Sequence, residues 1–302
     1  MATLLDRIAL AKRAPFHAMT PAQARAAYTQ GAEVLEPPRA PIHRVEDFAM
    51  PMPDGTTRPA RVYAPSGGHL PIVLYLHGGG FVVGNLETHD SLCRQLALRS
   101  GAAVVALDYR LAPEHRFPAA VDDCWAATRW LAAEGRALGL DAHRLAVAGD
   151  SAGGTLAAAS ALHARDIGLE LALQVLITPG TTANADTPSH RRFAQGYLLD
   201  AATIAWFFAQ YIDPAQRTDW RFAPLEADDL EGVAPACVVL AEADPLVDEG
   251  LQYADRLRAA RVPVSLEMAR GVTHDFIKLG RFLPEAAVAQ AAIAQALKEA
   301  FQ

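Results

Sequence analysis

The chain has 302 residues, a length that accommodates one large α/β unit or two smaller domains. Hydrophobic residues make up 51% of it and charged residues 20%, which provides for a large core and excludes disordered and fibrous classes of protein. The 27 Lys and Arg residues are outnumbered by 34 Asp and Glu, and the net charge of -7 argues against a nucleic-acid partner.

The cysteines and the N-terminal stretch bear on the cellular compartment. Cys93, Cys124 and Cys237 are scattered in a pattern that fits neither a disulfide framework nor a metal site, so we expect reduced, packed thiols and no metal. Asp6 and Arg7 interrupt the first apolar stretch, which argues against a secretory signal, and no apolar run of 18 residues follows. The sequence therefore predicts a cytoplasmic protein with no stable membrane association.

Two helices are predicted at the start of the chain. Residues 4–11 place apolar side chains at helical spacing, and Thr20–Gln23 combines a capping box with a proline at the first helical position. The second helix is expected to end near Gly31. The proline-rich joint at residues 37–41 then separates these helices from a region of short β-like runs.

Apolar runs alternate with helical patterns over the rest of the chain. Eight strands are predicted, at residues 42–50, 58–63, 72–76, 103–107, 145–148, 173–178, 236–241 and 264–268. Helices are predicted at residues 119–138, 153–165, 249–260 and 284–300. This order is that of an α/β fold with a mainly parallel sheet flanked by helices. The segment between Thr178 and Ala236 is too long for an ordinary connection and holds an apolar helix at 203–212, so we expect a cap over the sheet.

The strongest functional motif is Gly149-Asp150-Ser151-Ala152-Gly153, between the strand at 145–148 and the helix from Gly153. A serine on a tight strand-to-helix turn, flanked by small residues, is the nucleophile of the G-x-S-x-G elbow. The helix N-terminus behind it favours negative charge. A glycine-rich helix start without catalytic function is the alternative, and the flanking strand and helix argue against it.

His77-Gly78-Gly79-Gly80 directly follows the predicted strand at 72–76. A run of glycines leaves backbone N–H groups accessible to a ligand atom. We expect Gly78 and Gly79, with the N–H of Ala152, to donate hydrogen bonds to an oxyanion. A plain glycine-rich turn is the alternative.

A serine elbow also needs a base and an acid that orients it, in the chain order serine, acid, histidine. Asp244 follows the strand at 236–241, and Glu242 and Asp248 are competing acids nearby. We favour Asp244 because it lies at the carboxyl end of a strand. His274, the histidine that follows the last predicted strand, is the expected base.

Four ordered motifs, HGGGFVVGN at 77–85, DYRLAPEHRFPAAVDD at 108–123, GDSAGG at 149–154 and ADPLVDEG at 243–250, resemble the hormone-sensitive-lipase-like family of α/β-hydrolase esterases. The resemblance implies an α/β-hydrolase fold with a helical cap. The implied boundaries are cap segments at 1–40 and 181–222 and a catalytic core at 41–180 and 223–302.

The resemblance carries further expectations. It implies that the stretch from Asp108 to Glu114 is a buried structural bracket for the oxyanion loop, and it is compatible with a homodimer. The family commonly has glycine where Asp275 stands, so the surroundings of His274 differ here. Because the cap of this family varies, substrate-contacting residues do not transfer.

These features predict a serine carboxylesterase that acts through an acyl-enzyme, without metal or organic cofactor. The short cap favours small-molecule esters with short to medium acyl chains. Phe81, Trp206 and Phe207 fit an apolar acyl pocket and equally well an ordinary core. The alternatives are an amidase or formamidase with the same triad, and a ligand-binding homologue without catalysis, against which the presence of His274 argues.

Overall fold

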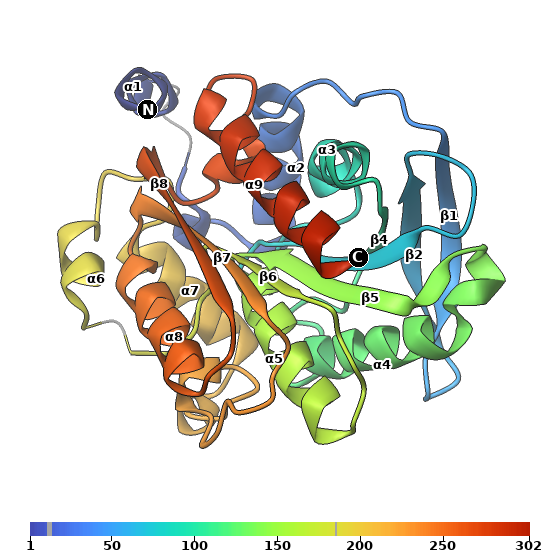
Figure 1. The fold of residues 1–302 in the computed structure, drawn as a ribbon. Coiled ribbons are helices and arrows are strands. Elements are labelled where there is room, and N and C mark those ends of the chain that lie inside the picture. The colour runs from blue at the N-terminus through green and yellow to red at the C-terminus, as the bar shows by residue number, and fades with distance from the viewer. Residues whose placement is uncertain (11–13, 185) are drawn as a thin grey trace.

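The computed structural model of the protein describes residues 1–10, 14–184 and 186–302, and its central feature is one eight-stranded sheet (Figure 1). The strands are β1 (Arg44–Pro51), β2 (Thr57–Ala64), β3 (Pro71–Leu76), β4 (Ala103–Leu107), β5 (Asp141–Asp150), β6 (Gln174–Ile177), β7 (Ala236–Ala243) and β8 (Val264–Thr273). Their order across the sheet is β1-β2-β4-β3-β5-β6-β7-β8. The β1–β2 and β2–β4 pairs are antiparallel and the other pairs are parallel, which confirms the predicted fold class.

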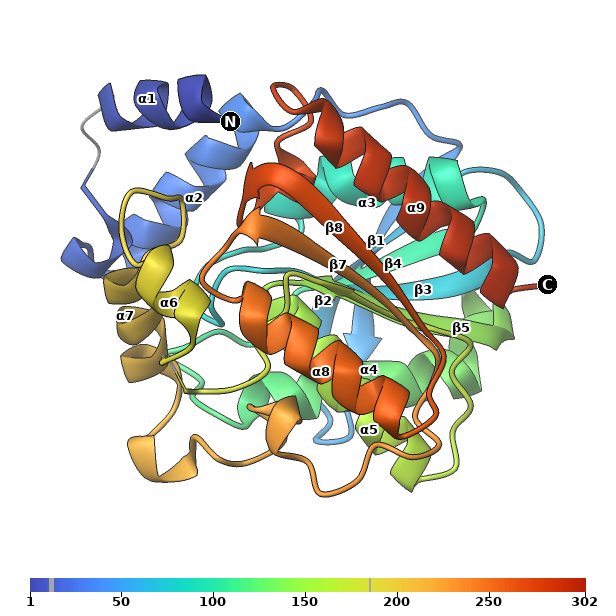
Figure 2. The same ribbon diagram turned by 60° about the vertical axis from the view of Figure 1, so that its left-hand side comes forward.

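Helices cover both faces of the sheet. The longer helices are α1 (Ala2–Leu10), α2 (Pro21–Leu35), α3 (Asp90–Ser100), α4 (Ala119–Glu134), α5 (Ala152–Asp166), α7 (Ala201–Tyr211), α8 (Val247–Ala259) and α9 (Pro284–Ala300). Helices α3 and α9 lie on one face, and α4, α5 and α8 lie on the other (Figures 1 and 2).

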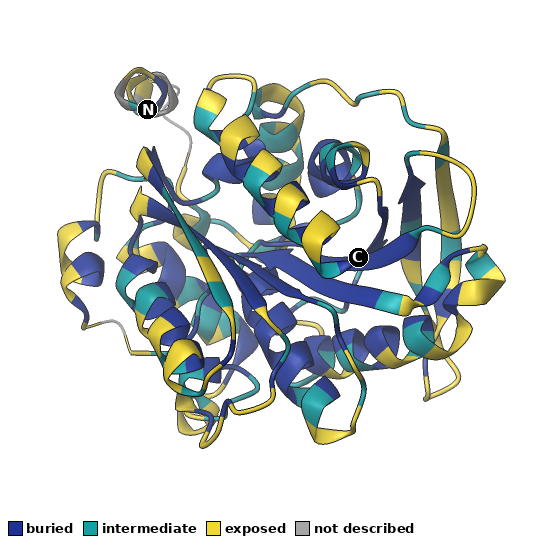
Figure 3. Cartoon of the chain, in the orientation of Figure 1, coloured by how far each residue is buried: buried dark blue, intermediate teal, exposed yellow. Residues whose placement is uncertain are grey.

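The alternation of side chains along β3 shows why both faces need a helical layer. Ile72, Leu74 and Leu76 belong to the core cluster on the α4–α5 face, whereas Val73 and Tyr75 belong to the cluster on the α3–α9 face. All five side chains are fully buried, so this strand is apolar on both sides, as is usual for a central parallel strand. Figure 3 shows the buried sheet between half-exposed helices.

Several predicted boundaries differ from the structure. Helix α2 runs to Leu35 rather than Gly31, and the helix predicted at 119–138 ends at Glu134 and continues as a 3-10 turn to Leu138. The end of the first predicted helix, at Ala11, lies outside the described residues. Helix α3 and the short helix α6 (Pro188–Arg192) lie where no element was predicted.

The two segments expected to form the cap lie together in space. Helices α1 and α2 of the first segment and α6 and α7 of the second lie on the same side of the molecule (Figure 2). Phe16 joins them, because its ring centroid lies 6.2 Å from that of Phe207 on α7. We call residues 1–40 and 181–222 the covering segments; their division from a core at 41–180 and 223–302 stays a prediction.

Within the described ranges, no helix is both long enough and apolar enough to cross a membrane. The three cysteines are free thiols, and all are buried, in line with their predicted role in packing.

Candidate active site

Ser151 occupies a strained turn between β5 and α5. Its backbone angles are φ 54° and ψ −121°, a region that few residues other than glycine adopt, and such strain is common at functional sites. The Ser151 N–H donates to the carbonyl of Ile177 at 2.8 Å, and α5 begins at the next residue. The serine is therefore held at the positive end of a helix dipole.

The glycines of the elbow are required by close backbone packing. A Cβ atom built on Gly153 would overlap the carbonyl oxygen of Leu76, and one built on Gly149 would overlap the carbonyl of Gly153. The turn can thus sit against the end of β3 only when both positions lack a side chain. This contact also places Ser151 beside the loop that follows Leu76.

His274 and Asp244 complete a hydrogen-bonded chain with Ser151. His274 Nε2 lies 2.8 Å from Ser151 Oγ, and His274 Nδ1 lies 2.7 Å from Asp244 Oδ2. Asp244 follows β7 and His274 follows β8, so the carboxyl ends of neighbouring strands bring the three together. The other carboxylate oxygen of Asp244 accepts the N–H of Leu246 at 2.9 Å, which fixes the acid in place.

The charge of Asp244 raises the pKa of His274. Burial by itself would lower the pKa of His274, but the adjacent Asp244 carboxylate outweighs burial and raises that pKa above its usual value, with a smaller contribution from Asp275. A raised pKa makes the imidazole a stronger base and stabilises the imidazolium that forms when it takes a proton.

The competing acids are engaged elsewhere. Asp248 Oδ2 accepts the N–H of Ser189 in α6 at 2.8 Å, and Glu242 Oε2 accepts the N–H of Gly271 at 2.7 Å. Of the acids considered from the sequence, only Asp244 contacts His274 Nδ1.

The expectation for Gly78 is wrong. Its N–H already donates to Asp150 Oδ1 at 3.1 Å, so it is not available to an oxyanion. Within the described part of the chain, the N–H groups of Gly79, Gly80 and Ala152 have no protein acceptor, and Gly80 and Ala152 line the same pocket as Ser151. Gly80 has φ 58°, and a Cβ there would overlap the ring of Phe207.

Asp150, inside the elbow motif, is the buried anchor of the glycine loop. Besides the Gly78 N–H, its carboxylate contacts the Tyr75 hydroxyl at 2.7 Å and His89 Nε2 at 3.2 Å. Burial alone would raise the pKa of Asp150, but the charge and hydrogen bond of His89 hold it below its usual value. Sequence reasoning gave Asp150, Tyr75 and His89 no role, although the motif contains Asp150.

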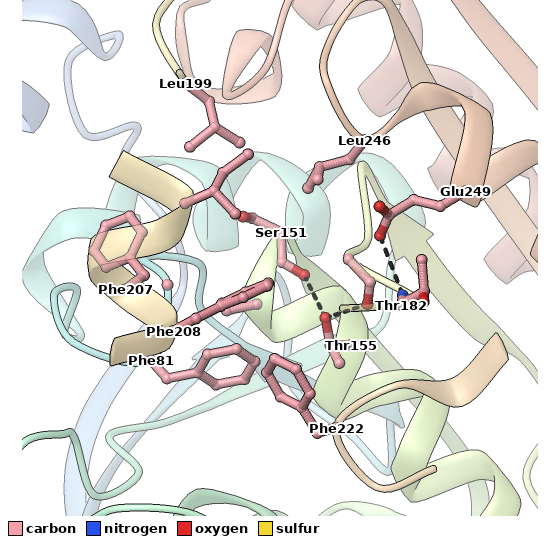
Figure 4. Close-up of a pocket in the computed structure, with 14 residues that line it drawn as sticks. Phe81, Ser151, Thr155, Thr182, Leu199, Phe207, Phe208, Phe222, Leu246 and Glu249 are labelled. Atoms are coloured by element: carbon pink, nitrogen blue, oxygen red, sulfur yellow. Dashed lines mark hydrogen bonds between the residues drawn. The ribbon is translucent and has the colours of Figure 1, made fainter. Parts of the chain in front are cut away.

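A small apolar pocket opens beside Ser151 (Figure 4). Its free volume is about 50 Å³, well below the ~300–1,000 Å³ of typical ligand pockets. It is lined by Gly80, Phe81, Ser151, Ala152, Thr155, Gly180, Thr182, Leu199, Ile204, Phe207, Phe208, Phe222, Leu246 and Glu249.

Two of the three aromatic residues proposed from the sequence line this pocket, and the third does not. Phe81 and Phe207 are lining residues, whereas Trp206 packs beside Phe207 at 5.3 Å and Phe208 takes the expected place. The helical period explains the correction, because Ile204, Phe207 and Phe208 share one face of α7.

Comparisons with known proteins identify the family of the chain. The sequence profile described as "alpha/beta hydrolase fold" matches residues 73–278. The ethyl acetate hydrolase of Pseudomonas putida is 42% identical over 292 residues, covering 94% of this chain and 92% of that protein. Esterase LipI of Mycobacterium tuberculosis is 44% identical over 260 residues, covering 82% of this chain and 81% of that protein. The chain belongs to the hormone-sensitive-lipase-like family of α/β hydrolases.

Solved structures of this family superimpose closely on the chain. An ester hydrolase from the metagenome of Lake Arreo matches with a TM-score of 0.95 at 40% identity, covering 99% of this chain and 98% of that one. The esterase of Pyrobaculum calidifontis matches with a TM-score of 0.93 at 41% identity, covering 98% of this chain and 96% of that one. As a member of this hydrolase family, the protein is a carboxylic ester hydrolase.

The bracket that the family resemblance implied is present, but it is not buried throughout. The Tyr109 hydroxyl donates to the carbonyl of His77 at 2.7 Å, and the Ala112 N–H donates to that of Phe81 at 2.9 Å, so both ends of the glycine loop are held. Asp108 and Glu114, however, have side chains that are 32% and 55% exposed.

Glu249 is a pocket residue to which sequence reasoning gave no role, although it lies in the ADPLVDEG motif. Its Oε1 accepts the N–H groups of Thr181 and Thr182 at 2.6 and 3.3 Å, and its Oε2 lies 3.5 Å from His190 Nε2. Burial raises the pKa of Glu249 to about 8. The wall of the pocket therefore includes a carboxyl group that is largely neutral at pH 7.

Among residues 1–10, 14–184 and 186–302, no group of three or more His, Cys, Asp and Glu is arranged to hold a metal ion.

Proposed function

We propose that this family member hydrolyses short-chain carboxylic esters through an acyl-enzyme formed on Ser151, with His274 as general base and acid and Asp244 as the residue that orients it. The observation that carries this proposal is the unbroken chain from Asp244 Oδ2 through both ring nitrogens of His274 to Ser151 Oγ. Each member has the partner that its step requires.

In the acylation step, Ser151 Oγ attacks the ester carbonyl while His274 Nε2 takes its proton. Negative charge develops on the carbonyl oxygen and is stabilised by the N–H groups of Gly79, Gly80 and Ala152. His274 then gives the proton to the leaving alcohol. Asp244 keeps the Nδ1–H tautomer and stabilises the transient imidazolium.

In the deacylation step, water takes the place of the alcohol. His274 removes a proton from that water, which attacks the acyl carbonyl of the Ser151 ester. The same N–H groups hold the second oxyanion, and the proton returns to Ser151 Oγ as the carboxylic acid leaves. No step needs a group from outside the chain other than water.

The pocket beside Ser151 supports a preference for short acyl chains. Its free volume of about 50 Å³ is enclosed by the rings of Phe81, Phe208 and Phe222. Each methylene that finds an apolar site gains ~0.8 kcal/mol, so kcat/KM rises with chain length only until the pocket is full. We expect a short-chain optimum and a decline by about ten carbons.

Active-site labelling tests the proposal. A fluorophosphonate probe followed by peptide mapping should label the peptide that contains Ser151, and the Ser151→Ala variant should stay unlabelled. Matched ester and amide substrates with the same acyl group then separate an esterase from an amidase. Labelling at another residue, or faster turnover of the amides, would contradict the proposal.

A further inference from the structure

A second and larger cavity lies next to the His274 loop. Its volume is about 390 Å³, and its walls come from the N-terminal helices and the stretch from Asp275 to Phe282. Most of its surface is apolar, contributed by side chains such as Phe16, Met19 and Leu279. The mechanism proposed above assigns nothing to it.

The transfer of a proton from His274 to the leaving alcohol indicates which part of the ester lies near this cavity. His274 Nε2 must reach the alcohol oxygen, so the alcohol lies beside His274 when the ester bond breaks. The small pocket is formed by Gly80 and Ala152, where the oxyanion and acyl group belong, whereas the large cavity is lined by Asp275, the residue after the base. An alcohol that extends past Asp275 would therefore enter a cavity other than the one that receives the acyl chain.

Asp275 places a carboxylate at the wall of this cavity. Its side chain is 28% exposed, and Oδ1 lies 4.0 Å from His274 Nε2. Among the described residues, no donor forms a hydrogen bond with its carboxylate. The backbone is left-handed at φ 63°, a conformation that Asp tolerates better than most side chains.

The ammonium group on the same wall is already engaged. Lys278 Nζ donates to the Tyr28 hydroxyl at 2.5 Å, lies 4.3 Å from the centroid of that ring, and is 3.8 Å from Glu36 Oε1. Asp275 has no comparable set of contacts.

We propose that the large cavity binds the alcohol portion of the ester and that Asp275 is a specificity-determining residue that favours alcohols carrying a positive charge. The inference rests on the proposed function, because it takes His274 as the proton donor to the alcohol. An amino alcohol or quaternary ammonium alcohol esterified to a short acid has the matching chemistry.

A pair of isosteric acetates tests the charge preference. Acetylcholine and 3,3-dimethylbutyl acetate have the same acyl group and nearly the same shape, and differ by one positive charge. We expect the ratio of their kcat/KM values, charged over neutral, to fall about three- to tenfold in Asp275→Asn and Asp275→Gly, as for two charges in a partly solvated site. The wild-type ratio should also fall at 1 M salt.

Filling the cavity tests its assignment. Gly31 lines it, and a Cβ built there meets nothing within 4 Å, so a side chain at this position is not blocked at its base and Gly31→Leu adds bulk to the wall of the cavity. This variant should lose kcat/KM on both bulky acetates and keep it on methyl acetate, with Gly31→Ala as the matched control. An unchanged charge ratio in both Asp275 variants, or full activity of Gly31→Leu on the bulky acetates, would overturn the inference. If the wild type hydrolyses none of these acetates, including methyl acetate, the proposed function itself fails.

Discussion

The strand ends around Ser151 and the covering segments at 1–40 and 181–222 build the site in different ways. Around the serine, backbone segments pack directly against each other, and Gly149 and Gly153 have no space for a side chain. The N–H of Gly78 is hydrogen-bonded to the buried Asp150. In the covering segments, aromatic side chains such as Phe207 supply the contacts, and Gly31 has open space beside it.

This difference separates what the chemistry requires from what the substrate decides. Oxyanion donors must hold their positions to within fractions of an ångström, and close backbone packing provides that accuracy. A pocket wall needs only volume and apolar surface, which many combinations of side chains can provide. Substitutions in the two regions should therefore have very different consequences.

The largest effect is expected at Gly153. A Cβ atom here would overlap the carbonyl oxygen of Leu76, and neither backbone segment can retreat without opening the sheet. Gly153→Ala should therefore destabilise the protein by more than about 3 kcal/mol or prevent folding. Urea unfolding followed by circular dichroism measures this, and a fold of wild-type stability would break the distinction between the two regions.

The next largest effect is expected on turnover when the acid is changed. Asp244→Asn should lower kcat by up to about 10⁴-fold with the fold intact, because an amide favours the wrong imidazole tautomer. Asp248→Asn should leave kcat nearly unchanged, because Asp248 contacts Ser189 of α6 rather than His274, and should cost at most about 1 kcal/mol of stability. Steady-state kinetics on the two purified variants separate them, and the reverse order of effects would assign the acid to Asp248.

The pH profile should report the charges around His274. Only the neutral imidazole can act as a base, so kcat/KM should rise with pH through the His274 pKa, which Asp244 and Asp275 raise above its usual value of about 6.5. Removing the Asp275 charge in Asp275→Asn should move this acid limb to lower pH. A limb that stays in place would show that Asp275 does not act on His274.

A smaller effect is expected from the pocket wall. Phe208→Ala should lengthen the preferred acyl chain, with a gain of up to about fourfold in kcat/KM per added methylene that the enlarged pocket accepts. Trp206→Ala is the matched control, because Trp206 lies on the same helix but off the pocket. A series of nitrophenyl esters measures both variants, and an equal shift in the control would remove Phe208 from the pocket.

The smallest effect is expected at Gly31, within helix α2. Because a methyl group fits there without contact, Gly31→Ala should stabilise the protein by about 0.5–1 kcal/mol through the lower backbone entropy of the unfolded chain. The urea midpoint should rise with activity on methyl acetate unchanged. Destabilisation would mean that the covering segments are packed as tightly as the elbow.

The same contrast explains how far the sequence could be interpreted. Strands such as β3 and β7 could be predicted because continuous apolar runs are typical of a buried parallel strand. The elbow and the order Ser151, Asp244, His274 could be found because sterics limit each position to few residue types.

The errors have physical causes as well. Helix α3 carries Leu92 and Leu96 four residues apart and ends at Gly101 with φ 76°, so its signal was present but was missed. Gly78 and Gly80 are equivalent as sequence, and the difference between them comes from Asp150, whose side chain reaches back from another strand. The two cavities depend on tertiary packing of the covering segments, which no local pattern records.

The central claim is that hydrolysis proceeds through an ester on Ser151, and trapping that ester is its most direct test. Rapid mixing of the wild-type enzyme with nitrophenyl acetate, followed by acid quenching and peptide mapping, should show a burst of nitrophenol and acetylation of the peptide containing Ser151. Ser151→Ala should show neither. Acetylation of another residue, or hydrolysis by the Ser151→Ala variant at the wild-type rate, would contradict the account.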